Sequence, residues 1–524
     1  MGGRIPSALA AVAAIAALAT GIVLGTHVAG GSDSSCYLNA ARLLSRGRVA
    51  LDPPLARTAS WKNAARTFTP SGFTSSPVDA FRLVPICSPG LPLTMAAFRT
   101  AHVTEMLVVP LLGALCVWLT YIVGRRVDRP LTGAAAAILL LCSPTFLYQL
   151  VQPMSDVPAA AWWMLTIAWA LEREDGSSRP DLAGLAASMA LVTRPNLLPL
   201  AGVVAIYLLV SRGRSGLSSA MRFALGLVPG ALLLAVLQRA MYGSPLATGY
   251  GDASTLMAAA NVLPNLRRYV GWLLAAHTPF LLLALAAPMV MRHQRHAWLC
   301  LAFAATTLAC YLPYVVFDAW WYTRFLLPAI PLLVILSAAG LVFLVERIVA
   351  TGRFAALVPI TVGFTVLLMG LWLSIARSRH AFELSEWEQH YYRAGMAVAA
   401  HVTGPSAIMT VRNSGSVQYY AGQPTVSWDS IEPAALDETL VFARDHGYPA
   451  YLLLEGDEEP VFRERFRAAS VIGNLDWPPR VQVGRTIRLY DPLDRARFLA
   501  DGQVRTEYVP DAPVPSRDWR RWFR

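Results

Sequence analysis

Seven carboxylates stand where they could do chemistry at the surface of a membrane. They flank long apolar segments in the first 376 residues: Asp33, Asp52, Asp79, Glu105, Asp156, Asp252 and Asp318. An ionisable group at the edge of a membrane is costly to keep there and is therefore a candidate for function. Asp33 follows the first apolar segment and Asp156 begins a later one. Each could act as a general base, or could only cap the N-terminus of a helix.

Positively charged residues and tyrosines lie beside the same segments. Such groups suit the binding of a lipid-linked phosphate. An aromatic belt with arginines that extend to the membrane surface would contain the same residue types. The belt is the favoured interpretation for Trp320, Trp321 and Tyr322, and both interpretations stay open for Arg324. The candidates for phosphate binding are Arg324, Arg267 and Arg268, with Lys62 and Arg82 in the first long loop.

Charge divides the chain into two parts. Hydrophobic residues make up 55% of the chain and charged residues 15%, and the net charge is +11. Residues 1–376 contain 26 basic and 13 acidic side chains, whereas the shorter 377–524 segment contains 18 and 20. This composition excludes a disordered chain and indicates a membrane-embedded part followed by a soluble part. The positive charge is typical of membrane topology here, and we expect no nucleic-acid partner.

Eleven segments without Asp, Glu, Lys or Arg predict eleven transmembrane helices, since about 20 apolar residues cross a bilayer. A cleaved signal peptide is the alternative for the first segment. A single kinked helix over 182–211 is the alternative for the fifth and sixth. The segments are Ile5–Ser32, 106–124, 130–155, 157–171, 182–193, 195–211, 223–238, 269–291, 296–317, 325–345 and 354–376.

The arginines predict the orientation of these helices. With a cytoplasmic N-terminus, thirteen arginines lie on the inside and five lie in the short outside loops. This distribution agrees with the positive-inside rule. It places loop 31–104 and residues 377–524 on the exoplasmic side. The kinked-helix alternative would place the tail in the cytoplasm.

Secondary structure is also expected outside the apolar segments. Loop 31–104 predicts two interfacial helices, Cys36–Arg48 and Pro89–Thr104, separated by an irregular 52–85 segment. The domains are then a membrane domain, 1–376, and an exoplasmic α/β domain, 377–524, in which strands alternate with helices. The strands are expected at 407–411, 450–454 and 487–490, and the helices at 388–402, 433–446 and 459–469.

Two of the six cysteines, Cys36 and Cys87, lie in the first exoplasmic loop. The exoplasmic space of many bacteria is oxidising, so these residues could form a disulfide that ties the two interfacial helices together. Two unpaired, buried thiols are the alternative. No spacing of cysteines and histidines in the sequence resembles a zinc site.

Several motifs occur in a recognisable order along the apolar segments, and a chain with this order resembles the GT-C superfamily of glycosyltransferases. It is similar to bacterial relatives of the protein O-mannosyltransferases and of the lipid A aminoarabinose transferase. The resemblance covers residues 1–376 well and the tail loosely. The matching features are Asp33 after the first segment, the two interfacial helices, Ser155-Asp156, Thr193-Arg194-Pro195-Asn196, the stretch from Tyr242 to Gly251, and Trp320-Trp321-Tyr322-Thr323-Arg324-Phe325.

The resemblance implies transfer of a sugar from a polyprenyl-phosphate donor to a glycan, lipid or protein acceptor. The reaction would take place on the exoplasmic face of a bacterial inner membrane, with inversion at the anomeric carbon. Asp33 would be the general base, and Asp156 would orient the acceptor or the sugar. Arg324, with Arg267 or Arg268, would bind the phosphate. Further candidates for substrate binding are Tyr37, Lys62, Arg82, Arg194, Tyr250 and Tyr322.

Metal-dependent members of this superfamily carry a second acid close to the first, in an Asp-x-Asp-like pair. Here Ser34 and Ser35 follow Asp33, so we expect no catalytic metal and no other cofactor. The competing interpretations are a transporter or flippase of lipid-linked saccharides, a ligase or polymerase of such saccharides, and a scaffold anchored by its helices. The nearly charge-free segments argue against transport, and one helix would suffice as an anchor.

Overall fold

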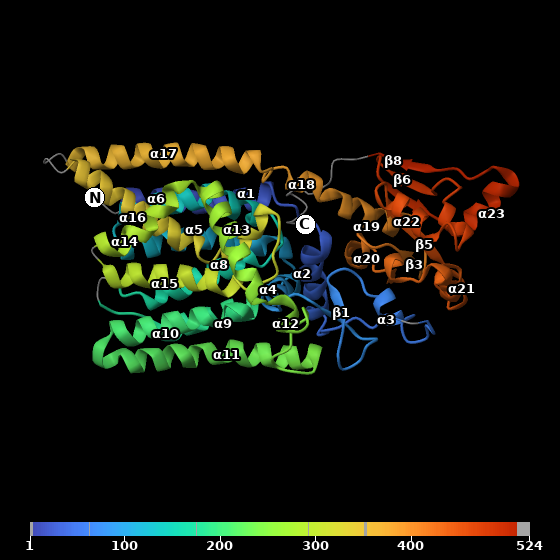
Figure 1. Cartoon of the computed structure of the whole chain (residues 1–524), viewed down its shortest axis with the longest axis horizontal. Helices are drawn as coiled ribbons and strands as arrows, with labels where there is room; N and C mark the ends of the chain where they lie inside the picture. Colours follow the sequence, from blue (N-terminus) through green and yellow to red (C-terminus); the bar gives the residue numbers. More distant parts are fainter. Residues whose placement is uncertain (1–3, 62, 174–175, 292, 350–353, 511–524) are drawn as a thin grey trace.

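Long apolar helices form a body at one end of the molecule, and a sheet with its own helices forms the other end (Figure 1). The computed structural model describes residues 4–61, 63–173, 176–291, 293–349 and 354–510. The helices of the body are α1 (Arg4–Val23), α5 (Val108–Val127), α6 (Pro130–Cys142), α7 (Pro144–Leu150), α8 (Asp156–Ala170), α9 (Pro180–Thr193), α10 (Pro199–Ser211), α11 (Gly216–Tyr242), α13 (Val262–His277), α14 (Leu283–Val290), α15 (Gln294–Tyr311), α16 (Ile330–Val349) and α17 (Phe354–Ser378).

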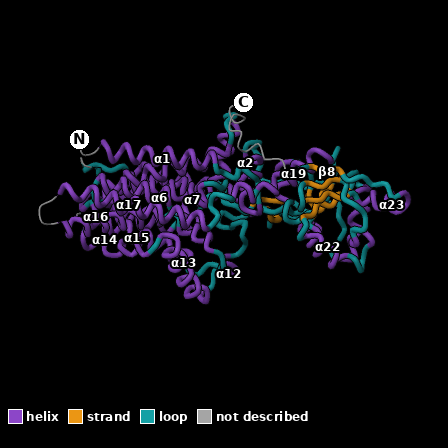
Figure 2. The backbone as a smooth tube through the Cα atoms, turned by 90° about the horizontal axis from the view of Figure 1, so that it is seen from above, coloured by secondary structure: helices purple, strands orange, loops and turns teal. Residues whose placement is uncertain are grey.

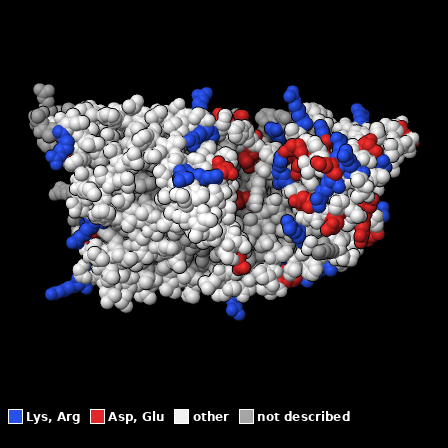
Figure 3. All heavy atoms as spheres, viewed as in Figure 1, with Lys and Arg blue, Asp and Glu red and all other residues white. Residues whose placement is uncertain are grey.

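The body has the surface of a membrane protein. On the face shown in Figure 3, the charged side chains of the body lie near its two ends and leave an uncharged band between them. Among the described helices, five are long and apolar enough to cross a membrane, and two further pairs qualify if each bent pair counts as one span. Helices α8, α9 and α10 are shorter, with 15, 14 and 13 residues.

The predicted spans are largely helical, but several are interrupted. The predicted span 130–155 is two helices, α6 and α7, bent by 60°. The first helix stops at Val23, and the next helix begins at Gly31 within the predicted span. The predicted span 269–291 is two helices, α13 and α14, that meet at an angle of 115°. The chain bends at Thr278, whose φ of 61° lies outside the helical region, and Pro279 disfavours a helical conformation there.

Helices α9 and α10 form a hairpin rather than one kinked helix. Arg212, just after α10, forms an ion pair of 3.7 Å with Glu172, in the loop that leads into α9. The end of α10 therefore lies beside the beginning of α9. Gly184 of α9 lies close to the backbone of α11. A Cβ atom on Gly184 would be 2.1 Å from the carbonyl oxygen of Phe223, so the glycine allows the two helices to pack closely.

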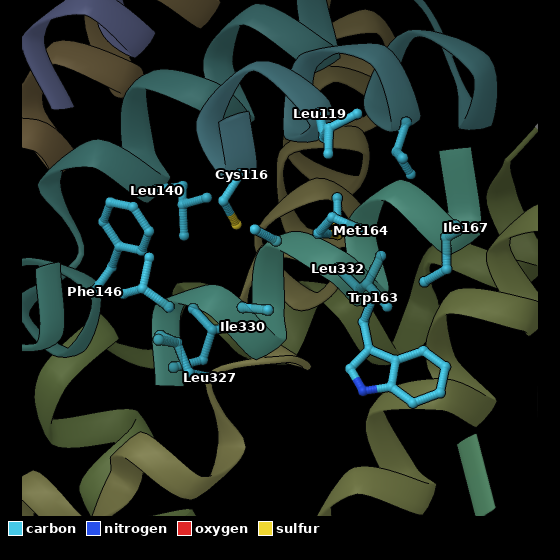
Figure 4. Close-up of a cluster of buried hydrophobic side chains, with 14 of the residues drawn as sticks. Cys116, Leu119, Leu140, Phe146, Trp163, Met164, Ile167, Leu327, Ile330 and Leu332 are labelled. Carbon is cyan, nitrogen blue, oxygen red and sulfur yellow. The ribbon is translucent and has the colours of Figure 1, made fainter. Parts of the chain in front are cut away.

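The interior of the body is closely packed and apolar. Figure 4 shows Cys116 and Leu119 of α5 above Trp163 and Met164 of α8, with Ile330 and Leu332 of α16 in the same cluster. All of these side chains are at least 95% buried. They hold α8, which begins at Asp156, and α16, which follows the Trp320–Leu326 turn, in a defined position.

Loop 31–104 packs between the body and the sheet. It contains α2 (Gly31–Leu44), α3 (Ala64–Thr67), strands β1 (Phe73–Ser75) and β2 (Leu83–Pro85), and α4 (Gly90–Thr100). The segment expected to be irregular thus includes an antiparallel β1–β2 hairpin. Helix α2 is buried along most of its length, against α4 and against α20 (Ser414–Tyr420) of the tail.

The structure joins Cys36 of α2 to Cys87, which precedes α4, in a disulfide. The other four cysteines are free. We expect iodoacetamide to label four cysteines of the denatured protein before reduction and six afterwards, as measured by intact mass. Labelling of six before reduction would contradict the pairing. In the loop-entropy model, a loop of this length stabilises the fold by about 4 kcal/mol, so Cys36→Ser with Cys87→Ser should lower the melting temperature.

The tail forms a six-stranded sheet of order β4-β3-β5-β7-β6-β8 (Figure 2). Its middle strands pair β3–β5 in parallel and β5–β7 antiparallel. The predicted strands and helices are present, and the sequence reasoning missed β4, β6, β8, α20 and α23. The elements are α18 (Leu384–Trp387), α19 (Gln389–His401), β3 (Ala407–Met409), α20 (Ser414–Tyr420), β4 (Thr425–Val426), α21 (Leu436–Asp445), β5 (Ala450–Glu455), α22 (Glu458–Phe466), β6 (Val481–Val483), β7 (Ile487–Tyr490), α23 (Pro492–Asp501) and β8 (Glu507–Val509).

The tail contacts loop 31–104 through α20. Asn39 Nδ2 donates a hydrogen bond of 2.9 Å to the carbonyl of Gly415, and Ser416 Oγ donates one of 2.7 Å to the carbonyl of Ala29. The Tyr420 hydroxyl accepts a bond of 3.0 Å from the amide of Ala29. The tail therefore holds the beginning of α2, where Asp33 lies.

Candidate functional site

Asp33 and Asp156 each form an ion pair with an arginine at the end of the body that faces the tail. Asp33 lies in the first turn of α2, and its Oδ2 accepts a hydrogen bond of 2.8 Å from Arg324 Nη2. Asp156 is the first residue of α8, and its Oδ1 accepts one of 2.6 Å from Arg194 Nη2. The N-cap positions belong to Gly30 and Ser155, so neither carboxylate caps its helix.

The two ion pairs differ in exposure. The side chains of Asp156 and Arg194 are 0% and 11% exposed, whereas those of Asp33 and Arg324 are 36% and 14% exposed. A substrate can therefore reach Asp33 but not the carboxylate of Asp156. The Oδ2 atom of Asp156 is buried and has no hydrogen-bond partner among the described residues.

Arg194 organises a buried polar network around Asp156. Its Nε donates to Ser155 Oγ at 3.3 Å, and its Nη1 donates to the Tyr311 hydroxyl at 3.0 Å. The Tyr37 hydroxyl shares a hydrogen bond of 2.7 Å with Ser155 Oγ. This network connects α2, α8, α9 and α15. It locates α2, and with it Asp33, relative to the helices of the body.

The ring of Phe325 lies between the two arginines. The guanidinium carbons of Arg194 and Arg324 are 5.6 and 5.3 Å from its centroid, and Arg324 is also 5.3 Å from the ring of Tyr322. Tyr311 stacks on Phe325 at 4.9 Å. Burial alone would lower the pKa of Arg324, but the charges of Asp156 and Asp33 outweigh burial and raise it. Arg324 therefore stays cationic and can bind an anion.

Tyr37 and Tyr250 also lie near Asp33. Burial, with a smaller contribution from Asp33, raises the pKa of Tyr37 to about 12, so its hydroxyl stays protonated. Burial of its hydroxyl, with a smaller contribution from Asp33, raises the pKa of Tyr250 as well. Tyr250 is 44% exposed and lies in the irregular segment after α11, which makes it accessible to a ligand.

Comparison with solved structures identifies the fold of this arrangement. The chain is similar to ArnT from Cupriavidus metallidurans bound to undecaprenyl phosphate, with a TM-score of 0.56, 15% identity and coverage of 88% of this chain and 94% of that chain. It is also similar to the archaeal oligosaccharyltransferase AglB from Archaeoglobus fulgidus in complex with an inhibitory peptide and a dolichol-phosphate, with a TM-score of 0.53, 12% identity and coverage of 88% and 71%. The chain has the GT-C fold.

A third structure with this fold is the mycobacterial arabinofuranosyltransferase AftD, with a TM-score of 0.50, 16% identity and coverage of 85% of this chain and 36% of that chain. No protein-family model and no curated protein matches the sequence. The GT-C fold and the apolar helices make the chain a multi-pass membrane protein.

The other predicted site residues form neither of these two ion pairs. Arg267 and Arg268 lie within α13 rather than before it, and Arg268 pairs with Asp318 and with the carbonyl of Phe317. Arg267 is exposed. Arg82 lies beside β2 in the β1–β2 hairpin. Lys62 lies outside the described residues.

The GT-C chain also has site residues that the sequence reasoning missed. Tyr311 hydrogen-bonds Arg194, and Tyr148 of α7 packs edge-to-face against Trp320 at 5.0 Å. The sequence does contain a pattern that could have indicated Tyr311. Aromatic residues occur at every third position at the end of this apolar segment, at Tyr311, Tyr314 and Phe317. Across the described ranges, no three His, Cys, Asp or Glu side chains gather as metal ligands would.

Proposed function

We propose that the protein transfers a sugar from a polyprenyl-phosphate donor to an acceptor on the exoplasmic face of a bacterial inner membrane. One observation carries the proposal. On a GT-C fold, a partly exposed carboxylate, Asp33, lies 2.8 Å from a cation, Arg324, that is suited to a phosphate. One group can activate an acceptor while the other binds the leaving group. Phosphate is already a good leaving group and requires no general acid.

The proposed reaction is a single displacement. Asp33 accepts the proton of the acceptor nucleophile, whose atom forms a bond to the anomeric carbon while the bond between that carbon and the phosphate oxygen breaks. The polyprenyl phosphate leaves with the electron pair, and its charge is stabilised by Arg324. Asp33 later releases its proton to water. Attack opposite the leaving group inverts the anomeric configuration.

Asp156 acts indirectly in this proposal. It is fully buried, so it orients Arg194, Ser155 and Tyr37 around the site instead of contacting the acceptor. Tyr250 and Tyr322, which lie near Asp33 and Arg324, line the route of the substrate. Arg267 and Arg268 stay candidates for the phosphate, because α13 packs against the Trp320–Leu326 turn that carries Arg324. Arg82, beside β2, stays a candidate in the first loop.

The proposed orientation follows from the charges at the two ends of the body. The positive-inside rule places the N-terminus in the cytoplasm. Because Asp33, Asp156 and Arg324 lie at the end that faces the tail, both the site and the tail are then exoplasmic. The acceptor is a glycan, a lipid or a protein.

The function can be tested with purified protein and a set of undecaprenyl-phosphate monosaccharides. We expect at least one donor to release undecaprenyl phosphate, either by transfer to an envelope extract or by slow hydrolysis. Mass spectrometry of the lipid measures the release. Absence of release and of binding with every donor would contradict the proposal and would favour transport or scaffolding.

We expect this activity to be independent of divalent metal. Arginine supplies the positive charge for the phosphate, so EDTA should leave the rate of release within about twofold of the untreated enzyme. The measurement is the rate with EDTA, followed by addition of Mg²⁺ or Mn²⁺. A loss of activity that either metal restores would show that a metal has a role in the reaction.

A further inference from the structure

Glu388 places a carboxylate at the junction of the membrane body and the tail. It lies between α18 and α19 and is half-buried. Burial raises the pKa of Glu388. Within the described residues its carboxylate forms no ion pair and no hydrogen bond. The nearby His390 lowers its pKa, but by less than burial raises it. Asp33 and Asp156, by contrast, are each neutralised by an arginine.

The carboxylate of Glu388 is seated against the beginning of α2. A Cβ atom on Gly30 would lie 2.1 Å from Glu388 Oε2 and 2.9 Å from the ring of Tyr391. The absence of a side chain at Gly30 therefore provides the space for the carboxylate. Gly30 is the N-cap residue of the helix that carries Asp33 in its first turn.

Aromatic side chains connect Glu388 to the Asp33–Arg324 pair. Tyr148 is near enough to both Glu388 and Arg324 to experience their charges. Trp320 packs edge-to-face on Tyr148, and Trp321 stacks nearly parallel to it at 6.3 Å. Trp321 is 41% exposed, so this aromatic surface is open to a ligand.

We propose that Glu388 binds the hydroxyl groups of the donor sugar, so that the tail completes the donor site. This inference rests on the proposed function. A sugar bonded to a phosphate on Arg324 extends from that arginine, and Tyr148 and the beginning of α2, where the Glu388 carboxylate lies, are the nearby elements. A carboxylate accepts charge-assisted hydrogen bonds from two neighbouring hydroxyls, and aromatic rings pack against the C–H face of a sugar. Glu388 is then a determinant of sugar specificity.

A purely structural role for Glu388 makes a different prediction. The N-terminus of a helix favours a negative charge, so Glu388 could only stabilise α2. In that case its loss would disturb Asp33 and Arg324, and it would weaken the binding of any ligand that carries the phosphate. A sugar contact would affect only ligands that carry the sugar.

The test compares the binding of bare undecaprenyl phosphate with that of undecaprenyl-phosphate mannose, glucose and galactose to the full chain. We expect wild type to bind at least one sugar-bearing lipid more tightly than the bare lipid. Glu388→Gln should weaken that binding by about 10- to 100-fold, the effect of a lost charged hydrogen bond, and should change the affinity for the bare lipid by less than about twofold. Glu386→Gln, two residues away on an exposed side chain, is the matched control.

A second variant tests the placement without removing the charge. Gly30→Ala puts a methyl group where the carboxylate lies, and we expect the same selective loss for the sugar-bearing lipid. Equal losses for the bare and sugar-bearing lipids would overturn the proposal in favour of the structural role. No loss in Glu388→Gln would overturn it as well, while leaving the transferase function intact. Failure of wild type to bind any of the four lipids would instead contradict the function itself.

Discussion

Asp33→Asn should lower the rate of sugar transfer by about 10²- to 10⁴-fold, which is the usual contribution of a general base. Asparagine has the size of aspartate and can still accept a hydrogen bond from Arg324, but it cannot take up the proton of the acceptor. The fold and the affinity for the donor should therefore change little. The measurement is kcat for release of undecaprenyl phosphate, together with donor binding.

Asp52→Asn is the matched control, since Asp52 belongs to the same loop and its surface ion pair with Arg48 is more than half exposed. It should keep the activity of wild type. Full activity in Asp33→Asn would mean that another group removes the proton. Equal losses in both variants would point to a general disturbance of the loop.

The second large effect is expected on stability. Replacing Asp156 by alanine leaves the Arg194 guanidinium buried without its counter-charge, which typically costs about 3–5 kcal/mol. Asp156 is fully buried and Arg194 is 11% exposed, so little solvent screens either charge. We expect Asp156→Ala to lower the melting temperature in detergent strongly and to abolish transfer, because Arg194 no longer holds Ser155 and Tyr311.

The exposed pair of Arg222 and Asp181 offers a control of the same chemistry. Its side chains are 53% and 46% exposed, and Asp181→Ala should cost less than about 1 kcal/mol. The double variant Asp156→Leu with Arg194→Met should recover part of the stability, because no unpaired charge remains. A melting temperature near that of wild type in Asp156→Ala would show that water or a ligand compensates the arginine.

The helical body could be predicted from the sequence because a membrane imposes a simple requirement on it. Each span needs a long run without charge, and such runs are visible residue by residue. The bend at Thr278 was missed because the run of apolar residues continues through it. The burial of α2 was missed for a different reason. Some of its partners belong to α20: Asn39 bonds Gly415, 376 residues later, and local periodicity carries no information about such a contact.

The same distinction between local sequence features and contacts of distant residues applies to the candidate site. Asp33 and Arg324 were identified from their positions at the ends of apolar segments, but their contact joins residues 291 apart in the chain. Arg194 was expected to bind substrate, and the structure places it in a buried network with Asp156. No feature of the sequence marked Glu388 as a site residue, since a glutamate between two short helices of a charged domain is common. Only the space above Gly30 makes it unusual.

The contact between α20 and α2 has a consequence for the order of biosynthesis. Ala29 and Tyr420 are 391 residues apart, so the ribosome makes the first partner long before the second. Asp33 therefore lacks its final support until residues 377–524, which include the sheet, have been made and have folded. An unfinished or truncated chain can insert its helices but cannot complete the site. Under the proposed function and orientation, sugar transfer becomes possible only after the tail has been translocated and has folded.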